Sequence, residues 1–390
     1  VSIQLVSAPA AAESLTAGIH FTYSYSDNIN KGTATVTVTA VAGGNYKGSA
    51  SKTFVITAKD ISDATVKVND IAAETYNGLA HTPTPVVNDS QSGTTLASGT
   101  DYTFTYSANV AAGTATITFT GIGNYTGTTT KNFTINARTL TGAKINGGNA
   151  LADETYTGAD ITPSSYSLEV DLTGSGTYTT LVLGTDFTLS YTNNRNAGTA
   201  TITFTGKGNY SGTVTADFKI NDATIIANVN ESELSWIYDG KTHKVGLGSA
   251  VAAYSSRALS DEIVNILIGY SVKGGNAVTL ELIKSDTKPT DWTGAKSTLD
   301  FKDVADGGKV WYRLTADNHA ELVGSFDIEI EQKEITAISG VAFNDRDYDG
   351  TTTATLNKTN AGNPTFTGML EGDTLTVDGA ENINFDTKNV

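Results

Sequence analysis

The chain contains a long internal repeat, and this repeat limits the folds available to it more than any other feature. Residues 101–136 align without a gap on residues 186–221, at an offset of 85, and 23 of the 36 positions are identical. A third copy occupies residues 20–57. Repetition at this length indicates small domains, each with a core of its own.

The repeats divide the chain into five predicted domains. Each full copy has an upstream marker, Tyr-x-Gly followed by Thr-Pro, which the first copy lacks, so we expect repeat one to be N-terminally truncated and the chain to be a piece of a larger protein. The fourth copy is divergent and longer, and the fifth stops at Val390 without its closing half. The predicted domains are 1–58 (repeat one), 59–136 (repeat two), 137–221 (repeat three), 222–331 (repeat four) and 332–390 (repeat five).

The joints between repeats are short and regular. The last apolar residue of one repeat and the first of the next are five positions apart, as with Ile56 and Ile61 or Ile135 and Leu140. Only four residues lie between each pair, and a Gly/Ser-rich tether is absent. The sequence therefore predicts stiff, closely abutting domains that form an elongated rod.

The repeated segments have the alternation of half-buried β-strands. In 114–120 the residues Ala115, Ile117 and Phe119 alternate with four threonines, which is a period of two. The Asn-, Ala- and Gly-rich segment 107–113 predicts a hairpin turn between this strand and the preceding one. No segment has a helical period with caps. We therefore predict an all-β protein of tandem small Ig-like β-sandwich domains, with a β-grasp-like arrangement as the alternative.

Composition excludes several classes of function. The chain has 25 Lys and Arg against 41 Asp and Glu, a formal charge of −16, which argues against nucleic acid and anionic lipid as partners. It has no cysteine, so disulfides, thiol nucleophiles and thiolate metal sites are excluded. No apolar run is long enough to span a membrane, so we expect no direct membrane insertion of this segment.

The sharpest metal candidate is an acidic segment in repeat five. Asp345, Asp347 and Asp349, followed by Gly350, have the spacing with which a calcium loop begins. Position twelve of such a loop would be Leu356, where a bidentate glutamate is needed, and flanking helices are not predicted. An acidic surface turn is the favoured interpretation, and calcium at these three aspartates is the alternative.

No set of residues predicts catalysis. The four histidines, His20, His81, His243 and His319, do not cluster in the sequence, and there is no Gly-x-Ser-x-Gly elbow. Acidic pairs such as Asp261-Glu262 are typical of solvated surface. We therefore expect no enzymatic activity and no cofactor.

Aromatic residues could form a recognition surface in repeat four. All three tryptophans of the chain, Trp236, Trp292 and Trp311, lie there. Packing in a β core is one interpretation, and a shallow face that stacks on sugar rings is the other. If one domain is specialised for binding a glycan or a host protein, we expect it to be 222–331.

The conserved pattern of the copies resembles a known repeat family. Tyr-x-Gly, Thr-Pro, Gly-Thr-Asp, Tyr-x-x-Asn, Ala-Gly-Thr-Ala-Thr, Gly-x-Gly-Asn-Tyr-x-Gly and Phe-x-Ile together resemble the MBG repeats of large bacterial surface proteins. Residues 1–221 carry the resemblance strongly, and 222–331 carry it in divergent form. Residues from Asp347 to Val390 resemble the start of a YDG-type domain.

The resemblance implies a role without catalysis. Such repeats occur as tandem extracellular β modules in secreted, adhesin-like proteins, so we expect a monomeric stalk or spacer at a bacterial cell surface. The alternative function is a glycan- or host-protein-binding module, most of all through 222–331.

Overall fold

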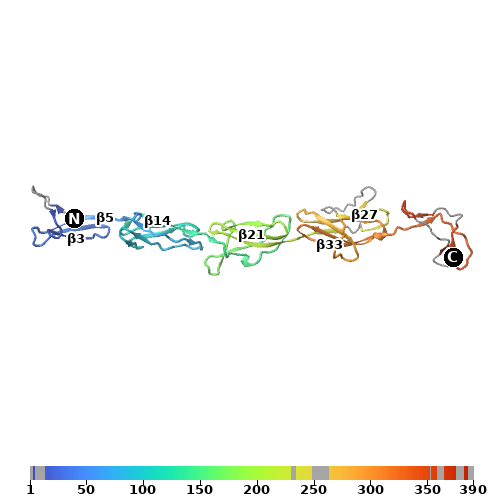
Figure 1. Ribbon diagram of the computed structural model, residues 1–390, viewed down its shortest axis with the longest axis horizontal. Coiled ribbons are helices and arrows are strands. Elements are labelled where there is room, and N and C mark those ends of the chain that lie inside the picture. Colours follow the sequence, from blue (N-terminus) through green and yellow to red (C-terminus); the bar gives the residue numbers. More distant parts are fainter. Residues whose placement is uncertain are drawn as a thin grey trace. The chain divides into compact units, whose positions relative to one another are not determined.

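The computed structural model describes residues 3–4, 14–229, 234–247, 263–351, 353–357, 364–374 and 382–384. Its backbone divides into two compact units. The first contains Val1–Ala150, Tyr166–Ser190 and Ile202–Ala216, and the second contains Leu151–Ser165, Tyr191–Thr201 and Asp217–Val390. Within the described residues there are no α-helices, only strands and short 3₁₀ turns, so the all-β prediction is confirmed (Figure 1).

Repeat two shows the sandwich most completely. One sheet has the strand order β11 (Tyr102–Ser107), β12 (Gly113–Gly121), β14 (Thr128–Asn136) and β8 (Glu74–Thr75). The other sheet has the order β10 (Thr94–Thr95), β9 (Val87–Asp89) and β7 (Val66–Val68). One apolar cluster draws on both sheets, which makes this domain a two-layer β-sandwich rather than the β-grasp-like alternative.

The alternation in the sequence is the alternation in the structure. Ala115, Ile117 and Phe119 of β12 are completely buried, whereas the threonines between them lie on the opposite, more open face. Strand β12 pairs with β11 and with β14 in antiparallel register, from Thr120 opposite Thr103 to Gly113 opposite Ile135. The predicted hairpin at 107–113 is confirmed.

Repeats three and four use the same strand order. In repeat three the order is β20 (Phe187–Thr192), β21 (Gly198–Gly206), β23 (Thr213–Asn221) and β17 (Glu154–Thr155). In repeat four it is β29 (Val278–Lys284), β31 (Gly308–Ala316), β33 (Leu322–Glu331) and β26 (Ser235–Ile237). Repeat four adds a second four-stranded sheet, formed by β25 (Ile226–Val229), β28 (Ile263–Ser271), β27 (Thr242–Leu247) and β30 (Leu299–Phe301).

Repeats one and five are smaller in the described part of the chain. Repeat one has the sheet β3 (Phe21–Ser26), β4 (Gly32–Ala40) and β5 (Ser49–Ile56), and Phe21, Val36 and Val38 line a hollow of about 740 Å³ on its apolar face. Repeat five has two short pairs, β34 (Ala337–Ser339) with β36 (Thr365–Thr367) and β35 (Thr353–Thr355) with β37 (Asn382–Asn384).

Candidate functional site: the joints between repeats

One asparagine in each of repeats two, three and four reaches back to the repeat before it. Its Oδ1 accepts a hydrogen bond from a backbone N–H of the earlier repeat. The donor is the residue directly before the strand β4, β12 or β21, each of which begins with a glycine. The three bonds run from Lys31 to Asn124 at 2.8 Å, from Ala112 to Asn209 at 2.8 Å and from Ala197 to Asn318 at 2.9 Å. Three successive joints therefore use the same contact at the same repeat position.

The backbone carbonyl of the same asparagine holds the linker. The N–H of Lys59 donates to the Asn124 carbonyl at 3.0 Å, and Arg138 and Ala223 make the same bond to Asn209 and Asn318. Each of these bonds lies at the start of a short parallel strand pair between the linker and the next repeat. The pairs are β6 (Lys59–Asp60) with β13 (Tyr125–Thr126), β15 (Arg138–Thr139) with β22 (Tyr210–Ser211), and β24 (Ala223–Thr224) with β32 (His319–Ala320). Since at most two residues separate each closing strand from the linker strand, the linker has little freedom of its own.

Parallel pairing places the Tyr-x-Gly marker at the joint. Strand β8 runs parallel to the end of the closing strand β14, with Glu74 opposite Ile135 and Thr75 opposite Asn136. Because the two strands run in the same direction, Tyr76, which follows β8, lies beside the end of β14, where the chain passes into the next repeat. Its N–H donates to the Asn136 carbonyl at 2.9 Å. The markers of repeats three and four are placed in the same way by β17 and β26.

The marker tyrosine packs on the residue after the joint asparagine. Tyr76 meets Tyr210 edge to face, with ring centroids 5.6 Å apart, and Tyr156 meets His319 in the same way at 5.5 Å. His319 therefore replaces a tyrosine without loss of the ring contact. Burial at this joint, with the neighbouring Tyr76, raises the pKa of the Tyr210 phenol to about 12.

The marker glycine lies directly against the following repeat. A Cβ on Gly158 would stand 2.3 Å from the Cα of Gly274, so no side chain fits there. The backbone of Gly158 also has φ +88°, a conformation that favours glycine. Gly78 and Gly240 occupy the same position, against Leu172 and Leu370.

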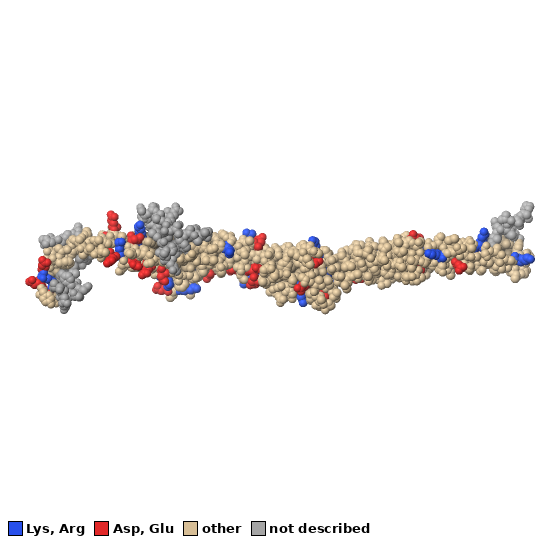
Figure 2. Space-filling model, turned by 180° about the vertical axis from the view of Figure 1, so that it is seen from behind, with Lys and Arg blue, Asp and Glu red and all other residues tan. Residues whose placement is uncertain are grey.

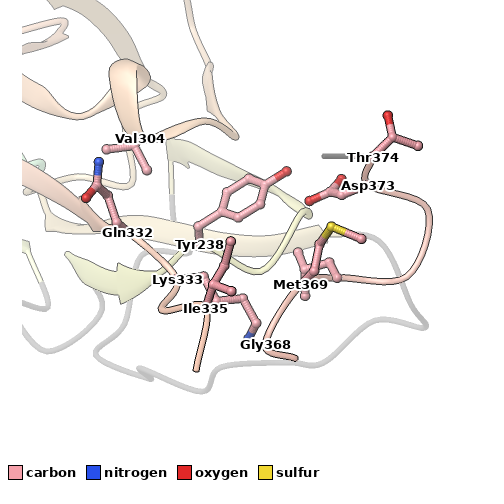
Figure 3. A pocket seen from close by; sticks show the side chains of 10 residues that line it. Tyr238, Val304, Gln332, Lys333, Ile335, Gly368, Met369, Asp373 and Thr374 are labelled. Atoms are coloured by element: carbon pink, nitrogen blue, oxygen red, sulfur yellow. The ribbon is translucent and has the colours of Figure 1, made fainter. Parts of the chain in front are cut away.

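The fourth joint contains a cavity. Tyr238 of repeat four projects toward repeat five, and a cavity of about 440 Å³ lies between them (Figure 3). Val304, Ile335 and Met369 supply apolar wall, while the Tyr238 hydroxyl points toward Asp373. Burial, with the Asp373 and Asp303 carboxylates, raises the pKa of Tyr238. This joint thus keeps the tyrosine and glycine of the marker.

Comparison with known proteins gives only distant similarity. No model of a known protein family matches the chain, and no curated protein matches it. Among solved structures, the protocadherin gammaB7 EC3-6 cis-dimer is 10% identical, with a TM-score of 0.19, over 81% of this chain and 94% of that chain. The protocadherin GammaB4 extracellular domain is 12% identical, with a TM-score of 0.19, over 90% of this chain and 66% of that chain. Similarity at this level supports no argument about function.

The three aspartates of the calcium candidate are exposed and lie in the segment between β34 and β35. Asp349 accepts hydrogen bonds from the Thr351 hydroxyl and N–H, and from Arg346 at 2.6 Å. These bonds, from Thr351 first and Arg346 second, lower the pKa of Asp349 to about 2. Within the part of the chain that the structure describes, no three His, Cys, Asp or Glu side chains are grouped so that they could hold a metal ion. Calcium binding by Asp345, Asp347 and Asp349 stays an untested alternative.

The three tryptophans lie in two places. Trp236 packs against the core of repeat four and stacks on His243, with ring centroids 4.0 Å apart. Trp311 projects from β31 and donates its indole N–H to the Ser285 carbonyl. Trp292, in the loop after β29, lies under the guanidinium of Arg313 at 4.9 Å. Residues two apart on a strand point to the same side, so Trp311 and Arg313 lie on one face of β31. Trp292 lies against Arg313 and therefore shares this face with Trp311, whereas Trp236 does not.

The four histidines lie at separate places. His20 accepts a hydrogen bond from the Thr16 N–H at 2.9 Å through Nδ1, and His243 lies 3.2 Å from the Asp239 carboxylate. His81 is buried within repeat two, and His319 belongs to the third joint. The pair Asp261-Glu262 lies outside the described residues. No helix among the described residues has the length and apolar character to cross a membrane.

Acidic charge is concentrated toward the C-terminal repeats. Residues 1–221 contain 11 basic and 15 acidic residues, whereas 222–390 contain 14 basic and 26 acidic residues. The face shown in Figure 2 has the same trend, with few charged side chains over repeats one and two. The net charge of −16 thus comes mostly from repeats four and five.

The sequence pattern contained the joint residues without revealing their role. The Asn-Tyr pair repeats with its glycines, a pattern that within a single repeat is typical of a turn. The partners Lys31, Ala112 and Ala197 contribute only a backbone N–H, so their side chains differ freely and give no signal. The available signal was the recurrence of Tyr-x-Gly and Asn-Tyr in successive repeats, although Asn318 is followed by His319 in repeat four.

Proposed function

We propose that this chain is a non-catalytic spacer from the extracellular part of a bacterial surface protein, built from MBG-like repeats and a YDG-like segment. The observation that carries the proposal is the recurrence of one set of joint contacts at successive joints. A chain of independent binding or catalytic domains would not need its joints to be alike. A spacer does need this, since each joint must hold the next repeat in a fixed direction.

The joint contacts are strong enough to restrict bending. The second joint combines the Ala112–Asn209 bond, the linker bond from Arg138 and the contact between Tyr76 and Tyr210. At about 1 kcal/mol for each hydrogen bond and about 1 kcal/mol for the aromatic pair, the closed joint is favoured by roughly 3 kcal/mol. That corresponds to about 100 closed joints for each open one.

Electron paramagnetic resonance tests whether the joints are fixed. The chain has no cysteine, so spin labels can be placed on cysteines at the exposed positions Thr103 and Thr188 in repeats two and three. We expect a narrow distance distribution, which broadens when Asn209 and Tyr76 are both changed to alanine. Labels at Thr103 and Thr130, both within repeat two, provide the control and should not respond. A broad distribution in the unaltered joint would contradict the spacer proposal.

The proposed location is tested on cells that produce the parent protein. An antibody against this chain should label intact cells, and external protease should remove the label. Labelling that appears only after lysis would refute an extracellular role.

A second candidate function is recognition of a glycan or host protein through repeat four. It is favoured by the outer face of β31, where Arg313 covers Trp292 and bonds Glu281 at 2.7 Å through Nε. Tryptophan is enriched at interfaces because its ring is apolar and its N–H is polar, and here it lies beside charged groups that can form hydrogen bonds. The test is a glycan array probed with the chain and with its Trp292→Ala variant. Selective signals that the variant loses would support recognition, and silence from both proteins would leave the spacer role alone.

A further inference from the structure

The closing strand of repeat two lies between two neighbours in its sheet. Strand β14 pairs with β12 over eight register pairs, from Gly113 opposite Ile135 to Thr120 opposite Thr128. On its other side it pairs in parallel with β8 over the last two residues. It is the last strand of the repeat, so any pull from the C-terminal side of the chain reaches the repeat through β14 (Figure 1).

The chain enters repeat two at one end of β14 and leaves at the other. Entry is through β6, whose residues pair with Tyr125 and Thr126, directly before β14 begins at Thr128. Exit is at Asn136, the last residue of the strand. The line between entry and exit therefore runs along β14, over nine residues, or about 26–30 Å.

Repeat four has the same path. The chain enters through β24, which pairs with His319 and Ala320, directly before β33 begins at Leu322. It leaves at Glu331, after ten residues of β33. Here too the closing strand lies between two others, β31 in antiparallel and β26 in parallel register.

We propose that these repeats are built to bear tension, with the closing strand loaded in shear. A pull along the chain slides β14 past β12 and β8, so the hydrogen bonds of both ladders resist together. A pull across the sheet would open the same bonds one after another. The Tyr76 N–H bond to Asn136 reinforces the exit end, where the load arrives. The inference rests on the proposed spacer role for the presence of tension, but the resistance itself follows from the strand order.

Single-molecule force measurement on the full chain tests the proposal by comparing two pulling directions on one domain. Handles on the double variant T57C/N136C pull along β14, and handles on A111C/N136C pull across its pairing with β12. All three positions are exposed. At equal loading rate we expect a severalfold higher unfolding force along the strand, with a shorter distance to the transition state. Thermal melting identical to that of the unaltered chain serves as the folding control.

The outcome is separable from the spacer proposal. An equal or lower force along β14 than across it would overturn the shear mechanism, whatever the location of the protein. Failure of the surface-labelling or joint-distance experiments would refute the spacer and leave the force comparison valid as a property of the domain.

Discussion

Replacement of the joint asparagine in repeat three should open one joint and leave its neighbours closed. Asn209 accepts the N–H of Ala112 through Oδ1, at 2.8 Å, in a partly buried site. The variant Asn209→Ala removes the acceptor, and the N–H is left without a partner beside the following repeat. Such a loss costs about 1–2 kcal/mol.

The cost can be read as hydrogen exchange at a single amide. If the Ala112 N–H exchanges through opening of the joint, about 1–2 kcal/mol corresponds to roughly 5- to 30-fold faster exchange. The equivalent amides of Lys31 and Ala197 bond to Asn124 and Asn318 and serve as internal controls. Their exchange should not change. Mass spectrometry of peptides that cover the three hairpin tips measures all three amides in one experiment.

A matched variant separates the hydrogen bond from packing. Asn209→Asp keeps an Oδ acceptor of the same size, so the Ala112 amide should retain most of its protection. The reasoning is refuted if Ala112 exchanges at the same rate in Asn209→Ala as in the unaltered chain, or if all three hairpin amides accelerate together.

Three further predictions concern other features of the chain. Gly158→Ala should speed hydrogen exchange in peptides around Gly274, because the added Cβ would collide with the Gly274 backbone. The control is Gly99→Ala, where φ is +86° and no atom lies close by, so the free energy of unfolding should fall only by the left-handed strain of about 1–2 kcal/mol. Burial would raise the pKa of Asp89, but bonds from Lys59, Tyr125 and a backbone N–H outweigh it and lower the pKa to about 2. Because that folded-state pKa lies below the unfolded value, the free energy of unfolding of repeat two should fall by roughly 2 kcal/mol as the pH falls from about 4 to about 2. Asp89→Asn should abolish this dependence. Urea unfolding of the whole chain, monitored in residues 59–136 by hydrogen-exchange labelling, measures it. Calorimetric titration of calcium into the chain should give no heat from Asp345, Asp347 and Asp349, and saturable heat that Asp349→Asn removes would reverse this interpretation.

The fold was predictable because its determinants are local and repeated. Strict alternation in 114–120 placed Ala115, Ile117 and Phe119 in the core, and all three are completely buried. Departures from the repeat were also informative. His20 stands where Asp101 and Asp186 stand in the other copies, and its Nδ1 accepts a loop N–H just as those carboxylates do. The histidine therefore preserves the hydrogen bond that the aspartates make.

The fourth repeat was harder to predict in detail. Its second sheet uses β27 and β28 in parallel register, and parallel strands need long connections that leave no hairpin signal in the sequence. The separation of Trp236 from Trp292 and Trp311 was equally out of reach, because the side of a strand that faces the core depends on register. The sequence placed the three tryptophans in one domain, and the structure places only two of them on one face.

The joints show why a repeated motif can be recognised and still be misinterpreted. Each joint is made from one repeat's asparagine side chain and the previous repeat's backbone N–H, so only the asparagine half of the contact depends on residue type. The marker position needs a glycine because a residue of the next repeat packs against it. That residue is Leu172 for Gly78, Gly274 for Gly158 and Leu370 for Gly240. A motif judged within its own repeat therefore looks like a turn. Its constancy across repeats whose other loops differ in length is explained by the joint, because successive repeats must present the same surface to one another even where their interiors diverge.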